Sequence, residues 1–362
     1  MKYKFLIIDY YIIKKFLGTF LYALILILAI TIAFDLSEKV DEFIELQLPF
    51  KKIAVEYYLN WIPYFANLFS SLFVFITVIF FTSKLASNTE IIAILSSGMS
   101  FNRMLFPFFI SASVIALASM ILSLYIIPPA NKIRLDFDNT YFRKPYRNRD
   151  NNIHKQIKPG VFIYMQSYST MSHVGYKFSI EEFENGQLKS KLLSNYARWD
   201  SVKNKWILSN YYIRNIDGLE ETIERGKKKD TTLNITPADF SSRLDVVETM
   251  NITELNKFIE KAKLQGDKNV VSYIFDKHSR FAYPFSILIL TLIGICLSSK
   301  KVKGGIGLNI GIGLLLSFTY IVFMRFSQIF ALSGTLHPVV AVWIPNIIYG
   351  IIAFFLYRLA PK

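Results

Sequence analysis

The chain has 362 residues, of which 52% are hydrophobic and 16% aromatic, and its mean hydropathy is +0.34. This composition excludes an ordinary soluble protein and indicates an integral membrane protein. The 41 Lys and Arg residues exceed the 27 acidic ones, an excess that a membrane protein carries in cytoplasmic loops and near anionic head groups, so we expect no nucleic-acid partner.

The first part of the chain, residues 1–130, predicts three membrane spans at 16–36, 61–82 and 104–127. Each is long enough, because about 20 apolar residues cross the hydrocarbon core of a bilayer. The first apolar run is too long for a signal peptide and no small-residue cleavage site follows it, so we expect it to be retained. We expect Pro128 and Pro129 to close the third span.

A short helix at about 84–98 is predicted between the second and third spans. Glu90 would lie in its first turn, where the helix dipole favours an acidic side chain, and Gly98 would end it. The possible capping residues are Ser87, Asn88 and Thr89, and the predicted apolar face consists of Ile91, Ile92 and Leu95. Such a helix either lies at the membrane surface as an ordinary loop or docks into a partner.

The following region, residues 131–277, predicts an inserted β-domain. Alternating apolar and polar residues predict strands at 161–166, 176–180 and 206–213, and Asn185-Gly186 is a strong hairpin signal. Strands at this spacing suggest a sandwich or a jelly-roll sheet. A linking helix is expected between Asn251 and Gly266, with one face formed by Leu255, Phe258, Ile259 and Ala262.

Residues 278–362 predict three further spans at 281–299, 304–331 and 338–357. The expected fold is therefore a polytopic α-helical membrane protein with six transmembrane helices and an inserted all-β, jelly-roll-like domain. Six spans place both termini on one side. On the side that carries the termini, the short loops and the termini hold eleven basic residues, whereas the other side holds only Lys39, Lys51 and Lys52. Because cytoplasmic loops carry the excess of Lys and Arg, we expect the termini and Glu90 in the cytoplasm. The eleven are Lys2, Lys4, Lys14, Lys15, Lys84, Arg103, Lys300, Lys301, Lys303, Arg358 and Lys362.

Catalytic and metal sites are not indicated. Cys296 is the only cysteine, and the four histidines, at 154, 173, 278 and 337, lack metal-ligand spacing. No phosphate-binding loop of the GxxxxGK[ST] type occurs, so the chain cannot itself bind ATP in that manner. The spans also lack the paired Asp residues or the Ser/Lys dyad of an intramembrane enzyme.

Several segments together resemble the LptF/LptG permeases of the lipopolysaccharide-export ABC transporter. They are IIDYYIIKKFLGTF near the N-terminus, TEIIAILSSGMSF around Glu90, HSRFAYPFSILIL at the fourth span and GTLHPVVAVWIPN near the C-terminus. Their order and spacing cover almost the whole chain. The opening IIDYY and the extended β-segment are more similar to LptG than to LptF.

The resemblance implies a permease without its own catalytic residue or cofactor, in the inner membrane of a Gram-negative bacterium. Lipopolysaccharide would be extracted through a lateral opening between this chain and a paralogous permease. A dimeric cytoplasmic ATPase would bind ATP and Mg, and a periplasmic jelly-roll bridge protein would receive the lipid. Helix 84–98 would be the coupling helix, with Glu90, Ile91, Leu95 and Gly98 contacting the ATPase. The alternative is a non-transporting anchor whose β-domain is an interaction module.

The chain departs from the family at the outer end of the first span, where LptG relatives tend to carry basic residues. Here Asp35, Glu38, Asp41 and Glu42 surround a single Lys39. Either the substrate carries fewer phosphates, or the phosphate contacts come from Lys39 together with Lys132, Arg134 and Arg325. For Arg325 two alternatives stay open, a latch with Asp35 and a side chain that snorkels to the membrane surface; for Lys132 and Arg134 the alternative is solvated charge.

Overall fold

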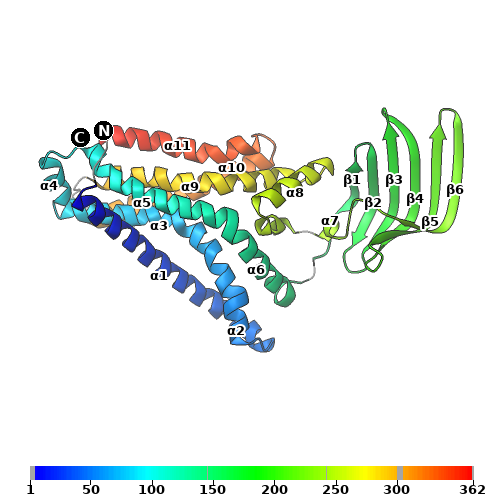
Figure 1. Cartoon of the computed structure of the whole chain (residues 1–362), viewed down its shortest axis with the longest axis horizontal. Helices are drawn as coiled ribbons and strands as arrows, with labels where there is room; N and C mark the ends of the chain where they lie inside the picture. The colour runs from blue at the N-terminus through cyan, green and yellow to red at the C-terminus, as the bar shows by residue number, and fades with distance from the viewer. Residues whose placement is uncertain (1–4, 145, 242, 300–304, 361–362) are drawn as a thin grey trace. The chain divides into compact units, whose positions relative to one another are not determined.

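The computed structural model describes residues 5–144, 146–241, 243–299 and 305–360, which form two compact units (Figure 1). The helical unit consists of Met1–Tyr141, Glu248–Ile252 and Val271–Lys362, and the β unit of Phe142–Val247 and Thr253–Val270. The sequence-based division at residue 130 falls inside a helix that continues to Tyr141. Lys2, Lys4, Lys300, Lys301, Lys303, Gly304 and Lys362 lie outside the described residues.

Six helices in the described part of the chain are long and apolar enough to cross a membrane, which confirms the predicted class of fold. The first three are α1 (Ile7–Glu45), a helix from Phe50 to Ser87, and a helix from Phe101 to Tyr141. The second comprises α2 (Phe50–Lys52), η1 (Ile53–Tyr58) and α3 (Leu59–Ser87), and the third comprises α5 (Phe101–Ile121), η2 (Leu122–Ile126) and α6 (Ile127–Tyr141). The last three are α9 (Val270–Ser298), α10 (Gly305–Leu332) and α11 (Pro338–Leu359).

The prediction that Pro128 and Pro129 end the third span is wrong, because the helix continues through both residues as α6. Proline lacks the N–H that would bond to the preceding turn. The π-helical segment η2 directly precedes the prolines and widens the helix there. A π segment changes which carbonyls need a donor, so the chain can pass through the prolines without leaving the helix.

Close packing and polar contacts between helices hold the helical unit together. Phe16, Phe75 and Phe108 are fully buried between helices. The Asn309 amide donates to the Ser83 hydroxyl at 2.9 Å, which joins α10 to α3. At Gly294 on α9, an added Cβ would lie 2.9 Å from the Val78 side chain, so α9 and α3 approach closely only because this residue is glycine.

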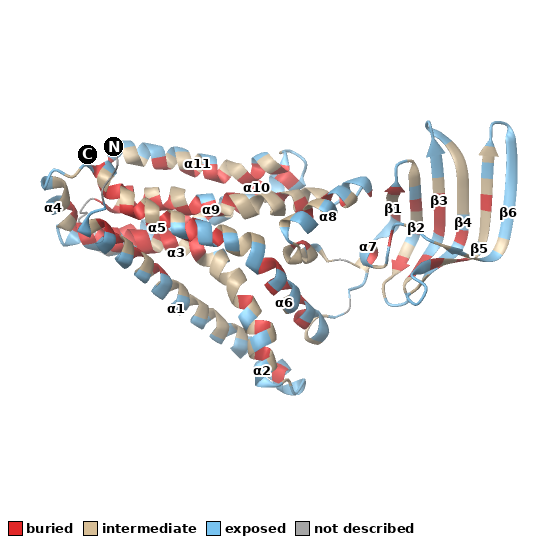
Figure 2. Cartoon of the chain, in the orientation of Figure 1, coloured by how far each residue is buried: buried red, intermediate tan, exposed pale blue. Residues whose placement is uncertain are grey.

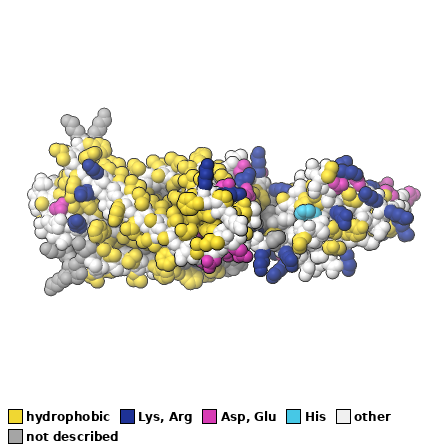
Figure 3. Space-filling view, turned by 90° about the horizontal axis from the view of Figure 1, so that it is seen from below, with side chains coloured by type: hydrophobic (Ala, Val, Ile, Leu, Met, Phe, Trp, Pro, Cys, Tyr) yellow, Lys and Arg dark blue, Asp and Glu magenta, His cyan; other side chains and the backbone are white. Residues whose placement is uncertain are grey.

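The outward faces of these helices are apolar. In Figure 2 the buried residues follow the helix contacts, whereas α1 is largely exposed along its length. Figure 3 shows hydrophobic side chains over most of the helical surface, with Lys and Arg more frequent over the β unit. An apolar surface of this extent requires lipid or another apolar partner around it.

The β unit contains one antiparallel sheet of six strands in the order β1-β2-β3-β4-β5-β6. The strands are β1 (Asn151–Lys158), β2 (Val161–Ser169), β3 (Val174–Glu184), β4 (Gln187–Asp200), β5 (Lys205–Asp217) and β6 (Glu220–Thr231). The inserted β-domain is thus confirmed. Its strand order is a meander rather than the pairing of sequence-distant strands that a jelly roll requires, because each short turn returns the chain beside the preceding strand.

The sequence predicted the central strands well. Asn185 and Gly186 both have positive φ, 52° and 78°, as a two-residue hairpin turn needs, and they join β3 to β4. Trp199 of β4 lies opposite Trp206 of β5, which starts the predicted strand 206–213. β1 and β6 were missed because both are rich in Lys, Asn and Glu and show little apolar alternation.

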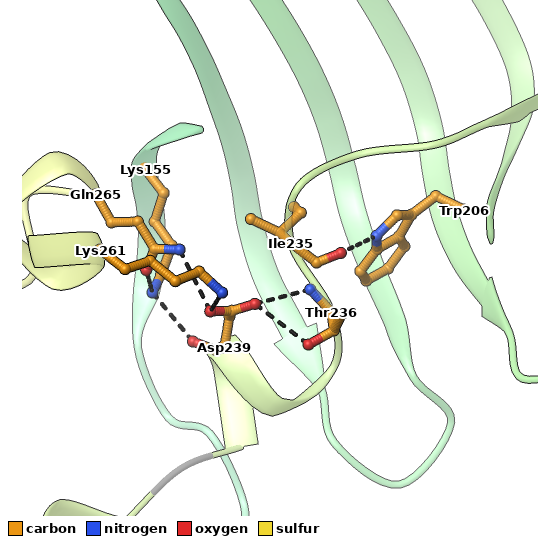
Figure 4. Close-up of polar contacts among 7 residues, drawn as sticks. All are labelled: Lys155, Trp206, Ile235, Thr236, Asp239, Lys261 and Gln265. Carbon is orange, nitrogen blue, oxygen red and sulfur yellow. Dashed lines mark hydrogen bonds and ion pairs between the residues drawn. The ribbon is translucent and has the colours of Figure 1, made fainter. Parts of the chain in front are cut away.

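The sheet's buried face is covered by α7 (Ala238–Ser241) and the segment before it. Trp206 is fully buried, and its indole N–H donates to the carbonyl of Ile235 at 2.9 Å (Figure 4). Ile163, Phe178 and Phe240 belong to the same buried cluster. The only hydrogen-bond donor of the indole is therefore satisfied within the core. This bond fixes the position of Ile235, and of the segment before α7, on the sheet.

The predicted linking helix is α8 (Ile252–Leu264), with Leu255, Ile259 and Ala262 buried and Gly266 beyond its end at φ +67°. Polar contacts join the end of α8 to β1 and α7 (Figure 4). Lys155 of β1 donates to the Gln265 amide oxygen at 3.1 Å and to the Asp239 carbonyl at 3.0 Å, and Lys261 pairs with the Asp239 carboxylate at 2.5 Å. Burial alone would raise the pKa of Asp239, but the Lys261 ammonium and the Thr236 N–H hold it below its usual range.

Candidate functional site

The short helix α4 (Glu90–Ser96) lies between α3 and α5, as the sequence predicted. It begins after Thr89, which has a left-handed backbone (φ +61°) and whose hydroxyl donates to the Asn88 carbonyl instead of capping the helix. Its last turn leads into Gly98 at φ +88°. The predicted helix 84–98 is therefore too long, because residues up to Ser87 belong to α3, and the N-cap residue Thr89 makes no side-chain cap.

The apolar face of α4 is divided between the interior and the surface. Ile91 is buried in the core between helices, and Leu95 is half-buried against the same core. Ile92, in contrast, is 56% exposed. Ile91 and Leu95 thus anchor α4 to its own chain, and the surface available to a partner consists of Glu90, Ile92 and the residues around them.

Glu90 is fixed by neighbours from two segments. One carboxylate oxygen accepts from the Asn88 amide at 3.1 Å, and the other accepts from the Tyr11 hydroxyl of α1 at 3.5 Å. The carboxylate keeps part of its surface exposed. It can therefore still accept hydrogen bonds from a basic partner while its orientation is set by α1.

A buried ion pair joins α1 to α5 at the same end of the helical unit. Asp9 is fully buried, and its two carboxylate oxygens accept from the two terminal nitrogens of Arg103, one of them at 2.7 Å. Asp9 also accepts from the Leu6 N–H at 2.8 Å, which closes the first turn of α1. We call the Asp9–Arg103 pair the α1–α5 clamp. The sequence analysis counted Arg103 only as a loop charge and did not pair the two residues.

Lys39 lies toward the opposite end of α1 and is held by an acidic and aromatic cluster. Its ammonium pairs with the Asp35 carboxylate at 2.8 Å and also contacts the Tyr57 hydroxyl. Tyr57 and Tyr58 both donate to Asp35, at 3.2 and 3.1 Å, from the π-helical segment η1. Asp35 is therefore occupied by Lys39 and the tyrosines, and the predicted latch between Asp35 and Arg325 is not formed.

Arg134 of α6 and Arg325 of α10 both act electrostatically on one residue, Tyr64 of α3, although 191 positions separate them in sequence. Arg134 lies over the Tyr64 ring, 5.3 Å from its centroid, and Arg325 is also within electrostatic range of Tyr64. Lys132, predicted with them, is exposed elsewhere on α6. Two of the four predicted phosphate-contacting residues thus share Tyr64 as an electrostatic neighbour.

Acidic residues and a third arginine complete this arrangement. Arg134 pairs loosely with Glu248 at 3.9 Å, and Arg325 donates to Gln328 at 3.2 Å. Arg280 donates to the Met250 carbonyl at 2.7 Å, and Asp276 lies within electrostatic range of Arg280 and Arg325. We call Arg134, Arg280, Arg325, Glu248 and Asp276 the arginine cluster. The sequence analysis missed Arg280, Asp276 and Glu248, which only folding places near one another.

The arginine cluster has the chemistry of an anion site. The guanidinium of Arg134 pairs with Glu248, and those of Arg280 and Arg325 both act on Asp276 electrostatically. The Arg134 Nε is buried and has no hydrogen-bond partner among the described residues. A planar guanidinium with a spare donor can bind a phosphate with two parallel hydrogen bonds.

No group of three His, Cys, Asp or Glu side chains that could hold a metal ion occurs in the described residues.

A model of the family described as lipopolysaccharide export system permease LptF/LptG matches residues 10–359. This match covers nearly the whole chain and does not distinguish LptF from LptG. No curated protein matched the chain.

Proposed function

The chain belongs to the family of lipopolysaccharide export system permeases LptF/LptG, and from this premise we propose that it is a transmembrane subunit of an ATP-driven transporter that extracts lipopolysaccharide from the inner membrane. It would act with a paralogous permease and a dimeric cytoplasmic ATPase, and it would pass the lipid to a periplasmic bridge protein. The closer similarity to LptG stays a prediction.

The observation that carries this proposal is the match to the permease family across both halves of the chain. It includes the six candidate spans and the inserted β-sheet as one continuous region. A permease of this family is a transport component and not an enzyme by itself. ATP and Mg would therefore be bound by the partner ATPase.

The coupling role assigned to α4 is supported by its surface. Glu90 and Ile92 offer a carboxylate beside an exposed apolar side chain, which suits a partner groove with a basic rim. Ile91 holds the helix against the core, and Tyr11 connects Glu90 to α1. A displacement of α4 by the ATPase would therefore be transmitted to α1 through the Tyr11–Glu90 hydrogen bond.

The substrate-contacting role assigned to Arg134 and Arg325 is supported by the arginine cluster. Lipid A phosphates are dianionic groups that guanidinium donors bind well in partly desolvated surroundings. Lys39 is a weaker candidate because Asp35 already neutralises it. Lys132, which is exposed, would contact phosphate only at the surface.

The orientation follows from the charge asymmetry of the loops, with the termini and α4 in the cytoplasm and the β unit in the periplasm. Labelling of single cysteines, on a Cys296→Ser background, would test it. A cysteine at Gly186 should react with a membrane-impermeant reagent from the periplasmic side. Labelling only from the cytoplasm would refute the orientation.

Co-purification and transport together test the function. The chain, expressed with its own paralogue and the ATPase, should co-purify with both and should release labelled lipopolysaccharide from proteoliposomes to a periplasmic acceptor only when ATP is present. Co-purification without ATP-dependent release would instead indicate the non-transporting anchor.

A further inference from the structure

The β unit carries a groove on the sheet face opposite its buried core, with a cavity volume of about 660 Å³. Side chains alternate along a strand, so Lys177, Ser179 and Glu181 of β3 line this groove, whereas Phe178 and Ile180 belong to the core. Strands β1 to β5 all contribute lining residues. The groove is therefore part of the sheet's solvent face and does not depend on the helical unit.

The floor of the groove is a cross-strand row of rings and one aliphatic side chain. The strand registers align Tyr164 with Ser179, Ser179 with Leu193, and Leu193 with Tyr212. The His154 ring lies 4.8 Å from the Tyr164 ring, and Phe162 lines the groove beside them. The Arg225 guanidinium lies over one face of the Tyr212 ring, 5.3 Å from its centroid, and the Tyr164 hydroxyl donates to Asn152 at 2.9 Å. The floor therefore offers a ligand the remaining ring surfaces and the Tyr212 hydroxyl.

A second row of residues crosses the sheet beside this floor. The registers on either side place the following exposed residues opposite one another, one from each strand: Asn152, Gln166, Lys177, Asn195, Asn210 and Lys227. We call them the polar row. Alternate strands have a left-handed backbone there, with φ of +56° at Asn152, +48° at Lys177 and +52° at Asn210.

This backbone is unusual inside strands, because residues other than glycine adopt positive φ only at a cost. At the polar row the buried positions shift within each strand, from Met165 to Tyr168 in β2 and from Phe178 to Gly175 in β3. Two consecutive residues of β3, Tyr176 and Lys177, are consequently both exposed. The row thus turns extra polar side chains outward at the edge of the groove.

Three side chains of the polar row line the groove and are free to bind. Lys177, Asn195 and Asn210 make no side-chain hydrogen bond or ion pair with any described residue. Of the two lysines that line the groove, Lys191 pairs with Glu181 at 2.7 Å and Lys177 makes no ion pair with a described residue, and the Arg225 guanidinium adds a second positive charge over the Tyr212 ring. The groove therefore combines ring faces, two amides that each donate and accept, and one free ammonium.

We propose that this groove binds an acidic saccharide, with sugar C–H faces on Tyr164 and Tyr212, hydroxyls on Asn195 and Asn210, and a carboxylate or phosphate on Lys177. This inference deepens the proposed function and rests on it for the source of the saccharide, the sugar portion of lipopolysaccharide. A purely lipidic ligand would leave the amides unused, and a protein strand would need a free sheet edge rather than a face.

The test uses the full-length protein in nanodiscs and, as probe, the lipid-free acidic core oligosaccharide released from lipopolysaccharide by mild acid. Binding is measured by saturation-transfer NMR and calorimetry. Asn195→Ala removes one amide, and Asn210→Gly removes another while keeping the left-handed backbone. Each should weaken binding about fivefold, the effect of losing one hydrogen bond of roughly 1 kcal/mol. The matched control is Asn215→Ala, an exposed amide of β5 outside the groove lining, which should bind normally.

The outcomes separate this inference from the proposed function. Oligosaccharide binding that is lost in the groove variants, but not in Asn215→Ala, supports the groove whether or not transport is observed. If intact lipopolysaccharide crosslinks to the chain but the oligosaccharide does not bind, or binds equally to all variants, the groove inference is wrong and the proposed function stands. Lys177→Asn should reduce binding more at low than at high salt; equal loss at both would contradict the role of its charge.

Discussion

Replacing Asp9 by Asn should destabilise the helical unit by removing one charge of the α1–α5 clamp. Asp9 is fully buried, and the Arg103 side chain is only 11% exposed. Removing one partner of a buried ion pair costs about 3–5 kcal/mol, because the other charge stays buried without compensation. Since some water reaches Arg103, we expect a loss near the lower end, about 3 kcal/mol. The Leu6 N–H keeps an acceptor in the Asn amide, so the start of α1 should not fray.

The free energy of unfolding can be measured by titrating the purified chain, in mixed micelles, with sodium dodecyl sulfate while following circular dichroism. Asp41→Asn is the matched control, because Asp41 is an exposed acidic residue of the same helix. It should change stability by no more than about 0.5 kcal/mol.

The double variant Asp9→Asn/Arg103→Met distinguishes a lost charge pair from a general packing defect. Without either charge, no buried ion is left uncompensated, so the double variant should be more stable than Asp9→Asn alone. The reasoning is refuted if Asp9→Asn lowers the free energy of unfolding no more than Asp41→Asn does. It is also refuted if the double variant has a lower free energy of unfolding than Asp9→Asn alone.

Four further outcomes are expected. Glu90→Lys should weaken binding of the ATPase by about 2–5 kcal/mol if water is excluded from the contact, and so reduce co-purification, with unchanged helix content. Unchanged association and transport would mean that α4 does not dock into the ATPase. Arg325→Ala should reduce crosslinking of lipopolysaccharide and Arg325→Lys should restore it partly, because Lys offers only a point charge; normal crosslinking in both would leave Arg325 as a snorkelling side chain. The pKa of Asp239 is below its usual range in the folded chain, so its stabilising effect is present above the ordinary carboxyl pKa and is lost as the pH falls through the lowered value; the hydrogen-exchange protection factors of the sheet amides should fall in acid, and less steeply in Asp239→Asn. Gly294→Leu should lower the free energy of unfolding by about 1–3 kcal/mol, because the leucine side chain would collide with Val78.

Local pattern was sufficient for much of this protein. Apolar runs of span length gave all six membrane helices, since the bilayer fixes how long such a run must be. Asn185-Gly186 gave the hairpin because few residue pairs tolerate two consecutive positive φ angles. The place of Glu90 in the first turn of α4 was also a local prediction, whereas the predicted start at residue 84 was wrong because α3 continues to Ser87. Each of these features depends on residues that are neighbours in the chain.

Pairings between distant residues required the tertiary structure. The clamp joins Asp9 to Arg103, and the neighbourhood of Tyr64 joins Arg134 to Arg325, yet none of these residues carries a local sign of its partner. The pairing of Asp35 with Arg325, left open by the sequence as an alternative, is not formed, since Asp35 pairs with Lys39 one helical turn away. The polar row is also invisible in sequence, since its members become a row only when six strands align in register. Composition and periodicity report the environment that a segment needs, whereas a charge or an amide can be satisfied by many partners, and only the packed chain selects one.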